Sequence, residues 1–346
     1  MTAPSLVLVA NAADGSISSF RLADDRLERI AVTDGLAGCS TFVVDTDRDL
    51  VYAAVKGAEK DEPAGILTLA LDRESGTLQP QSRLDLPRGG MNYLSLARGG
   101  TCLLGAAYSG GYGISCAVVD GVVGEPMSTI EYPNLHSVLP TADGRHAYFV
   151  SLGADLVAQY RIEDDLSLSS LQPATAPAPE GSGPRHLVLN EAEDAVYVIT
   201  EYSGEVLHYR RNQEDGTLTA LDAATFIDTS KGLGHSVFGA DPLAHHYIWG
   251  ADLHWGAGQT RLWGSERTEN TLGAVGVTAD GTLTPAETFT VTETQPRGFA
   301  LSPDGALLVA AGEESTTVSL YAVADDRLDL LQRVETGHGA NWVRFV

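Results

Sequence analysis

Positive charge is scarce in this chain, and lysine above all. Only three of the 346 residues are lysine, and 22 lysines and arginines face 46 aspartates and glutamates, for a formal net charge of −24. Sequence-independent binding to nucleic acid and attachment to anionic membranes both need a basic face, so we predict neither kind of partner. A small anionic substrate stays compatible with this composition, because a few arginines in a cleft override the mean field of the protein.

Cysteine and the common cofactor motifs are also missing. The three cysteines, Cys39, Cys102 and Cys116, form no CxxC pair, so neither a disulfide framework nor a structural zinc site is predicted. No GxGxxG string follows a strand and opens a helix, and no GxSxG elbow occurs, which disfavours a nucleotide cofactor and a serine hydrolase. We therefore expect no metal and no cofactor.

Long hydrophobic runs are absent as well. The apolar run at residues 5–10 is too short to cross a membrane as a helix, and no basic segment precedes it. No later segment is long and apolar enough to span a bilayer. A cytoplasmic location is the default expectation, and no pattern indicates a partner protein.

What the chain does have is an internal repeat. Two short apolar segments joined by a turn recur, as in HSVLPTADGRHAYFVSLG from His136, RHLVLNEAEDAVYVITEYSG from Arg185 and RGFALSPDGALLVAAGEES from Arg297. A third alternating segment and a DGTL-like turn to a fourth follow. The repeats start at residues 41, 92, 136, 185, 251, 297 and 341, so all steps but one are 44 to 51 residues long. The exception, 66 residues, predicts an insertion of roughly twenty residues before the repeat at 251.

Four short strands per repeat are typical of a propeller blade, so seven starts predict an all-β, seven-bladed β-propeller. The last repeat, NWVRFV from Asn341, is only half a blade. It can serve as an innermost strand whose partners come from the N-terminal segments LVLVAN and ISSFRL. Pairing the N- and C-terminal strands would close the ring and remove its exposed edges. We therefore expect one domain over residues 1–346.

A fixed spacing places polar side chains at one face of this disc. The first strand of a blade crosses the disc and the second returns, so the start of one and the end of the other share a face. A step of 16 residues separates Arg185 from Glu201, and likewise 251 from 267 and 297 from 313. The residues predicted to share this face are His136, Arg185, Glu201, Asp252, Arg267, Arg297 and Glu313.

Further cations and histidines are judged by the same geometry. Lys56 and Tyr108 fall near the same position in blades 2 and 3, and Arg88 precedes blade 3 closely enough to reach the same mouth of the channel. His186 alternates away from Arg185 and is expected to pack between blades. In a strand, the adjacent His245 and His246 would point to opposite faces and could not easily bind one metal. We expect both on the loop surface.

These residue types suit acid/base chemistry on an anion. An imidazole at His136 and a carboxylate at Glu201 can move protons, and Arg185 and Arg267 can hold a carboxylate, a phosphate or an oxyanion. The residues predicted to bind the substrate are Arg297, Asp252, Lys56 and Arg88. The alternative is a structural ring of ion pairs that closes the channel.

Several segments resemble the lactonase family of seven-bladed propellers. They are EGSGPRHLVL with YVITEYSGEVLHY, LHSVLPTADGRHAYFVSLGADLVAQY, TETQPRGFALSPDG and the closing TGHGANWV. The resemblance runs in order from about Leu6 to Val346. The family includes bacterial 6-phosphogluconolactonases and fungal enzymes that lactonise carboxy-muconate, and the latter imply a catalytic site of one His, one Glu and two Arg. By position these are His136, Glu201, Arg185 and Arg267.

The resemblance implies a metal-independent lactone hydrolase acting on a small anionic lactone, with 6-phospho-D-glucono-1,5-lactone as the first substrate to test. A lactonising cycloisomerase acting on a muconate-type dicarboxylate needs the same proton shuttle and anion clamp, so it stays open. A non-catalytic binding propeller is a third hypothesis. It predicts bland or hydrophobic residues at the mouth and a WD or GH signature that recurs from blade to blade, and the sequence shows neither pattern.

Overall fold

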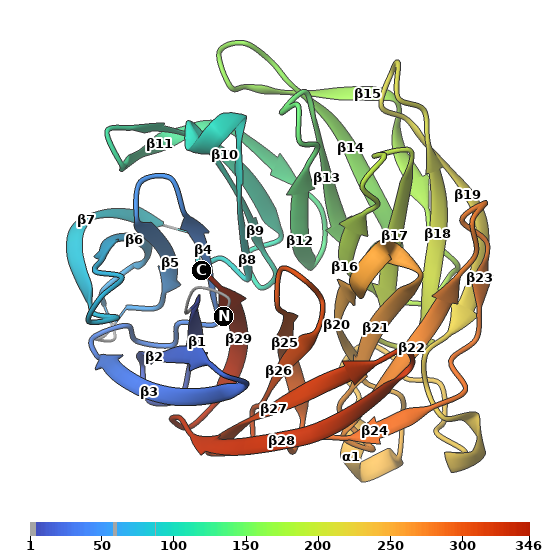
Figure 1. Cartoon of the computed structure of the whole chain (residues 1–346). Helices are drawn as coiled ribbons and strands as arrows, with labels where there is room; N and C mark the ends of the chain where they lie inside the picture. The colour runs from blue at the N-terminus through green and yellow to red at the C-terminus, as the bar shows by residue number, and fades with distance from the viewer. Residues whose placement is uncertain (1–4, 58–60, 87) are drawn as a thin grey trace.

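Seven antiparallel sheets surround a central channel in the computed structural model, which describes residues 5–57, 61–86 and 88–346 (Figure 1). This confirms the predicted seven-bladed propeller. Six sheets have four strands, and the sheet of blade 6 has five. The innermost strands, blade 1 to blade 7, are β29 (Ala340–Phe345), β4 (Thr41–Asp45), β8 (Tyr93–Ala97), β12 (Leu135–Pro140), β16 (Pro184–Leu189), β20 (Gly250–Trp255) and β25 (Pro296–Leu301).

The remaining strands follow outward in chain order, except that β1 follows β29 in blade 1. The second strands are β1 (Ser5–Asn11), β5 (Leu50–Val55), β9 (Cys102–Ala107), β13 (His146–Ser151), β17 (Ala195–Thr200), β21 (Arg261–Glu266) and β26 (Leu307–Gly312). The third strands are β2 (Ser16–Ala23), β6 (Ala64–Leu71), β10 (Tyr112–Val119), β14 (Leu156–Ile162), β18 (Glu205–Arg211), β22 (Thr271–Val277) and β27 (Thr317–Ala324). The outer strands are β3 (Arg26–Thr33), β7 (Leu78–Leu86), β11 (Val122–Glu131), β15 (Leu168–Pro177), β19 (Leu218–Thr225), β23 (Leu283–Thr284) with β24 (Phe289–Val291), and β28 (Arg327–Glu335).

Burial explains the sequence pattern of the strands. The second strands are buried along almost their whole length, because blades pack on both of their faces. The outer strands β11 and β28 alternate between buried and exposed residues, since one face meets solvent. In blade 7 the turn between the first two strands, β25 and β26, is fixed by a hydrogen bond from Ser302 Oγ to Asp304 Oδ1 at 2.6 Å, and Gly305 has a φ of +69°.

The ring closes as predicted. Strand β29 pairs antiparallel with β1, so the red C-terminal strand lies beside the blue N-terminal one in Figure 1. The indole N–H of Trp342 donates to the carbonyl oxygen of Phe42 at 2.8 Å, which ties blade 1 to blade 2. The two ends of the chain therefore build one blade between them.

The predicted insertion precedes β20 and holds little regular structure. Between the end of β19 and the start of β20 lie the short 3-10 helix η2 (Thr229–Lys231) and the single turn α1 (Pro242–His245). His245 and His246 are exposed there, as expected. Two more 3-10 turns are η1 (Arg98–Gly100) and η3 (Ala257–Gln259). None of the helices in the described ranges is long and apolar enough to cross a membrane.

Candidate functional site

An extra residue interrupts the pairing of five innermost strands close to their amino ends. In β16, Pro184 pairs with Thr200 and His186 with Ile199, so Arg185 has no partner of its own. Such a β-bulge turns the side chain of the extra residue and tightens the local twist. The equivalent bulged residues are His136 in β12, Ala251 and Asp252 in β20, Arg297 in β25 and Asn341 in β29.

The residue after the second strand returns to the same level. The backbone N–H of Glu201 donates to the carbonyl oxygen of Gly183, which lies just before the bulge, at 2.7 Å. The same bond forms from Arg267 to Trp249 and from Glu313 to Gln295. The predicted 16-residue spacing therefore brings these side chains to the mouth of the channel that the bulges face.

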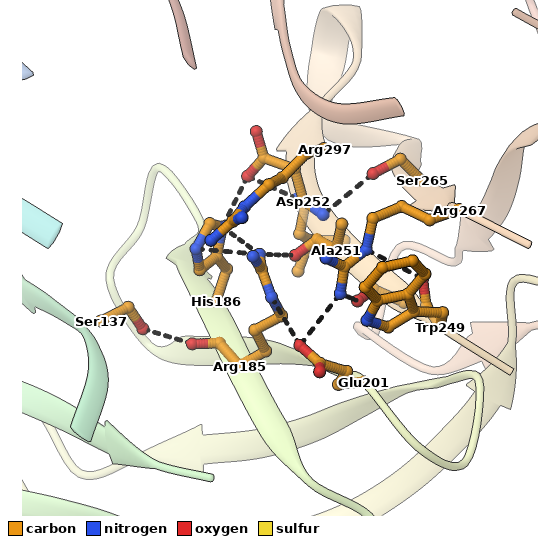
Figure 2. Close-up of polar contacts among 12 residues, drawn as sticks. Ser137, Arg185, His186, Glu201, Trp249, Ala251, Asp252, Ser265, Arg267 and Arg297 are labelled. Carbon is orange, nitrogen blue, oxygen red and sulfur yellow. Dashed lines mark hydrogen bonds and ion pairs between the residues drawn. The ribbon is translucent and has the colours of Figure 1, made fainter. Parts of the chain in front are cut away.

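Five charged side chains at this mouth form one alternating series, which we call the charged chain. Glu201 Oε2 accepts from Arg185 Nε at 2.9 Å and lies 3.1 Å from Arg267 Nη2. Arg267 Nη1 lies 3.9 Å from Glu313 Oε2, and Arg297 Nη1 donates to Glu313 Oε1 at 2.6 Å. Figure 2 shows the part of this series around Glu201. Within the charged chain itself, three guanidinium groups face two carboxylates, so the series carries one net positive charge in an acidic protein.

Arg185 and Arg267 are the two inner arginines of the charged chain, and each has contacts besides those to carboxylates. The Arg267 guanidinium stacks 3.9 Å from the ring centre of Trp249 and donates to the carbonyl oxygen of Gly250 at 3.1 Å (Figure 2). Burial lowers the pKa of Arg267, and burial together with Arg267 lowers the pKa of Arg185 to about 9. Both groups remain cations at neutral pH and stay in place for an incoming anion.

His136 lies behind the charged chain. Its ring meets Tyr108 and His186 edge-on, with ring centres 5.6 and 5.1 Å apart. Its Nδ1 is buried and has no hydrogen-bond partner among the described residues. Burial and the nearby arginines, Arg185 foremost, hold the pKa of His136 well below its ordinary value, so the imidazole is neutral at pH 7. The neutral ring can therefore accept a hydrogen bond, whereas full protonation is disfavoured by burial and by the neighbouring arginines.

The expectation that His186 packs between blades is wrong. Its Nε2 lies 3.1 Å from Arg185 Nη1, and its Nδ1 lies 2.7 Å from Asp252 Oδ1, so it faces the channel beside Arg185. Strict alternation fails here because the bulge at Arg185 lets two consecutive side chains point the same way. Burial lowers the pKa of His186 to about 3, so the neutral ring accepts from Arg185 and donates to Asp252.

Asp252 lies deeper in the channel than the charged chain. Its second carboxylate oxygen, Oδ2, lies 3.0 Å from His254 Nε2, and the side chain is buried. Although burial opposes ionisation, the two histidine contacts keep the pKa of Asp252 well below its ordinary value. Asp252 therefore holds His186 and His254 and does not line the cleft described next.

A cleft of about 590 Å³ opens beside the charged chain at the same mouth. It is lined by Lys56, Tyr108, Arg297, Glu313 and Asn341 among others. Lys56 is exposed, and among the described residues no carboxylate lies within ion-pair distance of it. The cleft thus presents two cations to a ligand, Lys56 and Arg297, and Arg297 is paired with Glu313. Glu314 also lines the cleft.

Arg88 is a second predicted substrate-binding residue, besides Asp252, that does not line this cleft. Its Nη1 donates to Glu131 Oε1 at 2.7 Å, and its guanidinium lies 4.9 Å from the ring centre of Tyr112. These partners belong to the outer half of blade 3, and Arg88 lines a separate hollow of about 340 Å³. Gly89, with a φ of +106° that favours glycine, lies between Arg88 and the innermost strand β8.

Sequence reasoning missed Trp249 and the role of His254. Trp249 ends the insertion, where no repeat defines a register, and only its place two residues before the bulge at Ala251 marks it. No group of three His, Cys, Asp or Glu residues able to hold a metal ion occurs within residues 5–57, 61–86 and 88–346.

Comparisons with known proteins agree on one family. The profile of the family "Lactonase, 7-bladed beta-propeller" matches residues 7–345. The 6-phosphogluconolactonase of Klebsiella pneumoniae subsp. pneumoniae is 26% identical over 325 residues, which are 93% of this chain and 92% of the relative. The 6-phosphogluconolactonase of an Enterobacter species is also 26% identical, over 92% of this chain and 91% of its own.

Two solved structures have the same fold. The periplasmic gluconolactonase PpgL of Pseudomonas aeruginosa superimposes with a TM-score of 0.86 at 24% identity, covering 99% of both chains. A Bacteroides fragilis protein superimposes with a TM-score of 0.87 at 21% identity, covering 100% of this chain and 98% of its own. At these identities the likeness supports the architecture and leaves the substrate to be argued from the site.

Proposed function

Because the chain belongs to the lactonase family of seven-bladed β-propellers, we propose that it hydrolyses a lactone at the mouth that carries the charged chain. The observation that supports this most directly is the state of Glu201. Both arginine contacts fall on its Oε2, at 2.9 and 3.1 Å, and Oε1 has no partner among the described residues. A carboxylate fixed at one oxygen and open at the other is suited to take a proton from water.

In the proposed reaction, Glu201 accepts a proton from the water molecule that attacks the lactone carbonyl. The carbonyl oxygen becomes an oxyanion, and the excess positive charge of the charged chain stabilises it. When the bond from the carbonyl carbon to the ring oxygen breaks, Glu201 returns the proton to that oxygen and a hydroxy acid leaves. The neutral ring of His136 orients the water or the ring oxygen.

Exposure assigns different tasks to the arginines. The side chains of Arg185 and Arg267 are 2% and 3% exposed, whereas those of Glu201 and Arg297 are 15% and 27% exposed. The buried pair acts on the reaction through its charge and by orienting Glu201. Arg297 and Lys56 are the cations within reach of an anionic substituent on the substrate.

We propose 6-phospho-D-glucono-1,5-lactone as the substrate. Two relatives that align along nine-tenths of the chain carry the name 6-phosphogluconolactonase. Lys56 and Arg297 line the cleft beside the charged chain, and a phosphate on the far end of a sugar lactone suits such a pair.

Hydrolysis of freshly generated 6-phosphogluconolactone and of unphosphorylated glucono-1,5-lactone, each measured above the spontaneous background, tests this proposal. Glu201→Gln should lower kcat by about 100-fold or more, the usual contribution of a general base. His136→Ala should lower it by about tenfold or more, and Lys56→Gln should raise KM for the phosphorylated lactone alone.

Matched controls are Glu287→Gln, His245→Ala and Lys231→Gln, all on exposed side chains away from the cleft. They should leave the rates unchanged, and so should a chelator. Absence of a rate above background on both lactones would overturn the phosphogluconolactonase proposal and direct attention to muconate-type substrates. A rate abolished by chelator would show that the reaction depends on a metal.

A further inference from the structure

The opposite mouth of the channel is hollow too. A depression of about 1110 Å³ is formed there by the carboxyl ends of the innermost strands, opposite the mouth that carries the charged chain. Its wall combines polar and charged residues with apolar ones, among them Leu96, Leu139, Leu189, Leu301 and Phe345. A concave surface that offers apolar area together with convergent polar groups is a usual form of a small-molecule site. We call it the opposite hollow.

Two arginines line this hollow. Arg98 Nη1 lies 3.9 Å from Asp164 Oδ1, whereas Arg344 has no counter-charge among the described residues. The Arg344 guanidinium lies 4.1 Å from the ring centre of Trp342 and donates to the carbonyl oxygen of Val343 at 2.7 Å. Among the described residues no carboxylate forms an ion pair with it, although the chain has about two acidic residues for each basic one. A half-buried guanidinium with only neutral partners favours an anion from outside the chain.

The rim limits which anion fits. Glu191 and Glu193 lie at the edge of the hollow, and Glu193 Oε1 accepts from the backbone N–H of Ala142 at 2.6 Å. Two rim carboxylates repel a polyanion such as a sugar bisphosphate. A ligand with one negative charge and an apolar body satisfies both Arg344 and the leucine-lined wall.

A continuous series of hydrogen bonds joins this hollow to the charged chain. His254 lines the hollow, and its Nε2 lies 3.0 Å from Asp252 Oδ2. Asp252 Oδ1 lies 2.7 Å from His186 Nδ1, and His186 Nε2 lies 3.1 Å from Arg185 Nη1. Figure 2 shows the Arg185, His186 and Asp252 part of this series, which we call the channel relay.

We propose that the opposite hollow is a second ligand site for a small monocarboxylate with an apolar body, bound through Arg344, and that its occupancy reaches the charged chain through the channel relay. The ligand touches His254, whose Asp252 contact also fixes His186 and, through it, the orientation of Arg185. Binding at one mouth then changes affinity at the other, and the coupling is reciprocal. This proposal stands independently of which lactone is hydrolysed.

The binding half is tested by calorimetric titration of the full chain with 4-phenylbutyrate and with its neutral amide. The acid should bind at least about tenfold more tightly than the amide, a difference of about 1.4 kcal/mol. Arg344→Gln should remove this preference. Arg327→Gln, a loss of an exposed arginine paired with Asp329 outside the hollow, should retain it.

Lys56→Gln separates the two mouths. Binding of 4-phenylbutyrate that survives Lys56→Gln and is lost in Arg344→Gln supports the second site. Equal binding of acid and amide, or loss in Lys56→Gln with retention in Arg344→Gln, overturns it. If Arg344→Gln fails to fold, Arg344→Lys is titrated in the same way. In that variant, unchanged affinities for both 4-phenylbutyrate and its amide would contradict the guanidinium contact.

The relay half has a readout that needs no enzyme activity. The imidazole N–H that His186 shares with Asp252 should give a downfield proton resonance, assigned by its loss in His186→Gln. Saturating 4-phenylbutyrate should shift this resonance in the wild type. In His254→Gln the probe should still bind and the shift should disappear. A resonance that never moves on binding overturns the relay.

Discussion

At the scale of single residues, the channel mouth keeps two arginines out of water without leaving either unsatisfied. Arg185 uses Glu201, His186 and the carbonyl oxygen of Ala251, and Arg267 uses Glu201 and the Trp249 ring. Removing one partner of such a network leaves the others as unpaired buried charges, so the loss in free energy of unfolding exceeds the contribution of a single contact. Burial, and after it the same crowding of cations, keeps the nearby histidines neutral, because a proton on either would be poorly solvated and would add to the positive charge.

The neutral histidines predict how stability depends on pH. In the unfolded chain His186 takes up a proton near its ordinary pKa of 6.5, whereas in the folded chain burial lowers that pKa to about 3. Between these values the unfolded state binds more protons, so this contribution is complete above pH 6.5 and is lost as the pH falls toward 3. The free energy of unfolding should drop by about 2 kcal/mol for His186 between pH 6.5 and 4.5.

Urea denaturation of the wild type and of His186→Gln at pH 7.0, 5.5 and 4.5 checks this. The loss of stability with acid should be smaller in His186→Gln and unchanged in His245→Gln, whose ring is exposed. An identical acid-dependent loss in His186→Gln and the wild type would contradict the assignment of a neutral, buried ring.

At the scale of elements, the bulges decide what the innermost strands present to the channel. A regular strand would turn alternate side chains away, but the bulged strands β16 and β20 place Arg185, His186 and Asp252 on the channel side. The bulged strands also approach each other closely. A Cβ on Gly298, the residue after the bulge in β25, would lie 2.3 Å from the carbonyl oxygen of Asn341 in β29.

This close approach makes Gly298 a sensitive position. Gly298→Ala forces β25 and β29 apart and should reduce the free energy of unfolding by about 1–3 kcal/mol, the usual cost of overpacking a core. Gly124→Ala, in the outer strand β11, is the matched control, because the nearest atom to its added Cβ is the carbonyl oxygen of Ala117 in β10, 3.5 Å away. Chemical denaturation of both variants measures the difference, and equal stabilities would show that the strands can separate freely.

At the scale of the whole molecule, the N- and C-terminal strands share a blade. We propose on this ground that residues 1–346 fold as one domain, since neither end of the chain completes a sheet without the other. The indole of Trp342 also packs edge-on against Tyr93 and His186, with ring centres 5.2 and 5.8 Å away. Closure of the ring and assembly of the channel are therefore coupled.

Removal of residues 340–346 should open the ring. The truncated chain loses the partner of β1 and the Trp342 contacts, so a bare strand edge is left. We expect loss of the single cooperative thermal transition and a tendency to associate, measured by calorimetry and light scattering. A synthetic peptide of residues 340–346 should bind the truncated chain and restore the transition. A monomeric truncated chain with an unaltered transition would contradict this account of closure.

The repeat pattern alone determined the blade number, the closing strand and the shared mouth of six of the seven side chains assigned to it, all except Asp252. A blade has a fixed strand length, so a 16-residue step from Arg185 to Glu201, or from Arg297 to Glu313, must return to the same face. His136 and Arg267 follow from the same spacing. These conclusions needed only local periodicity, which the sequence carries in full.

The tertiary structure decided what local periodicity does not encode. The bulge that turns His186 into the channel arises from the pairing of two strands, and the turn that directs Arg88 to Glu131 depends on contacts with outer strands. Trp249 belongs to an insertion that has no repeat register. Arg344 lacks a counter-charge because the other innermost strands place no carboxylate within ion-pair distance of it among the described residues. Periodicity determines which face a side chain reaches, whereas its partners depend on the packing of separate blades around one channel.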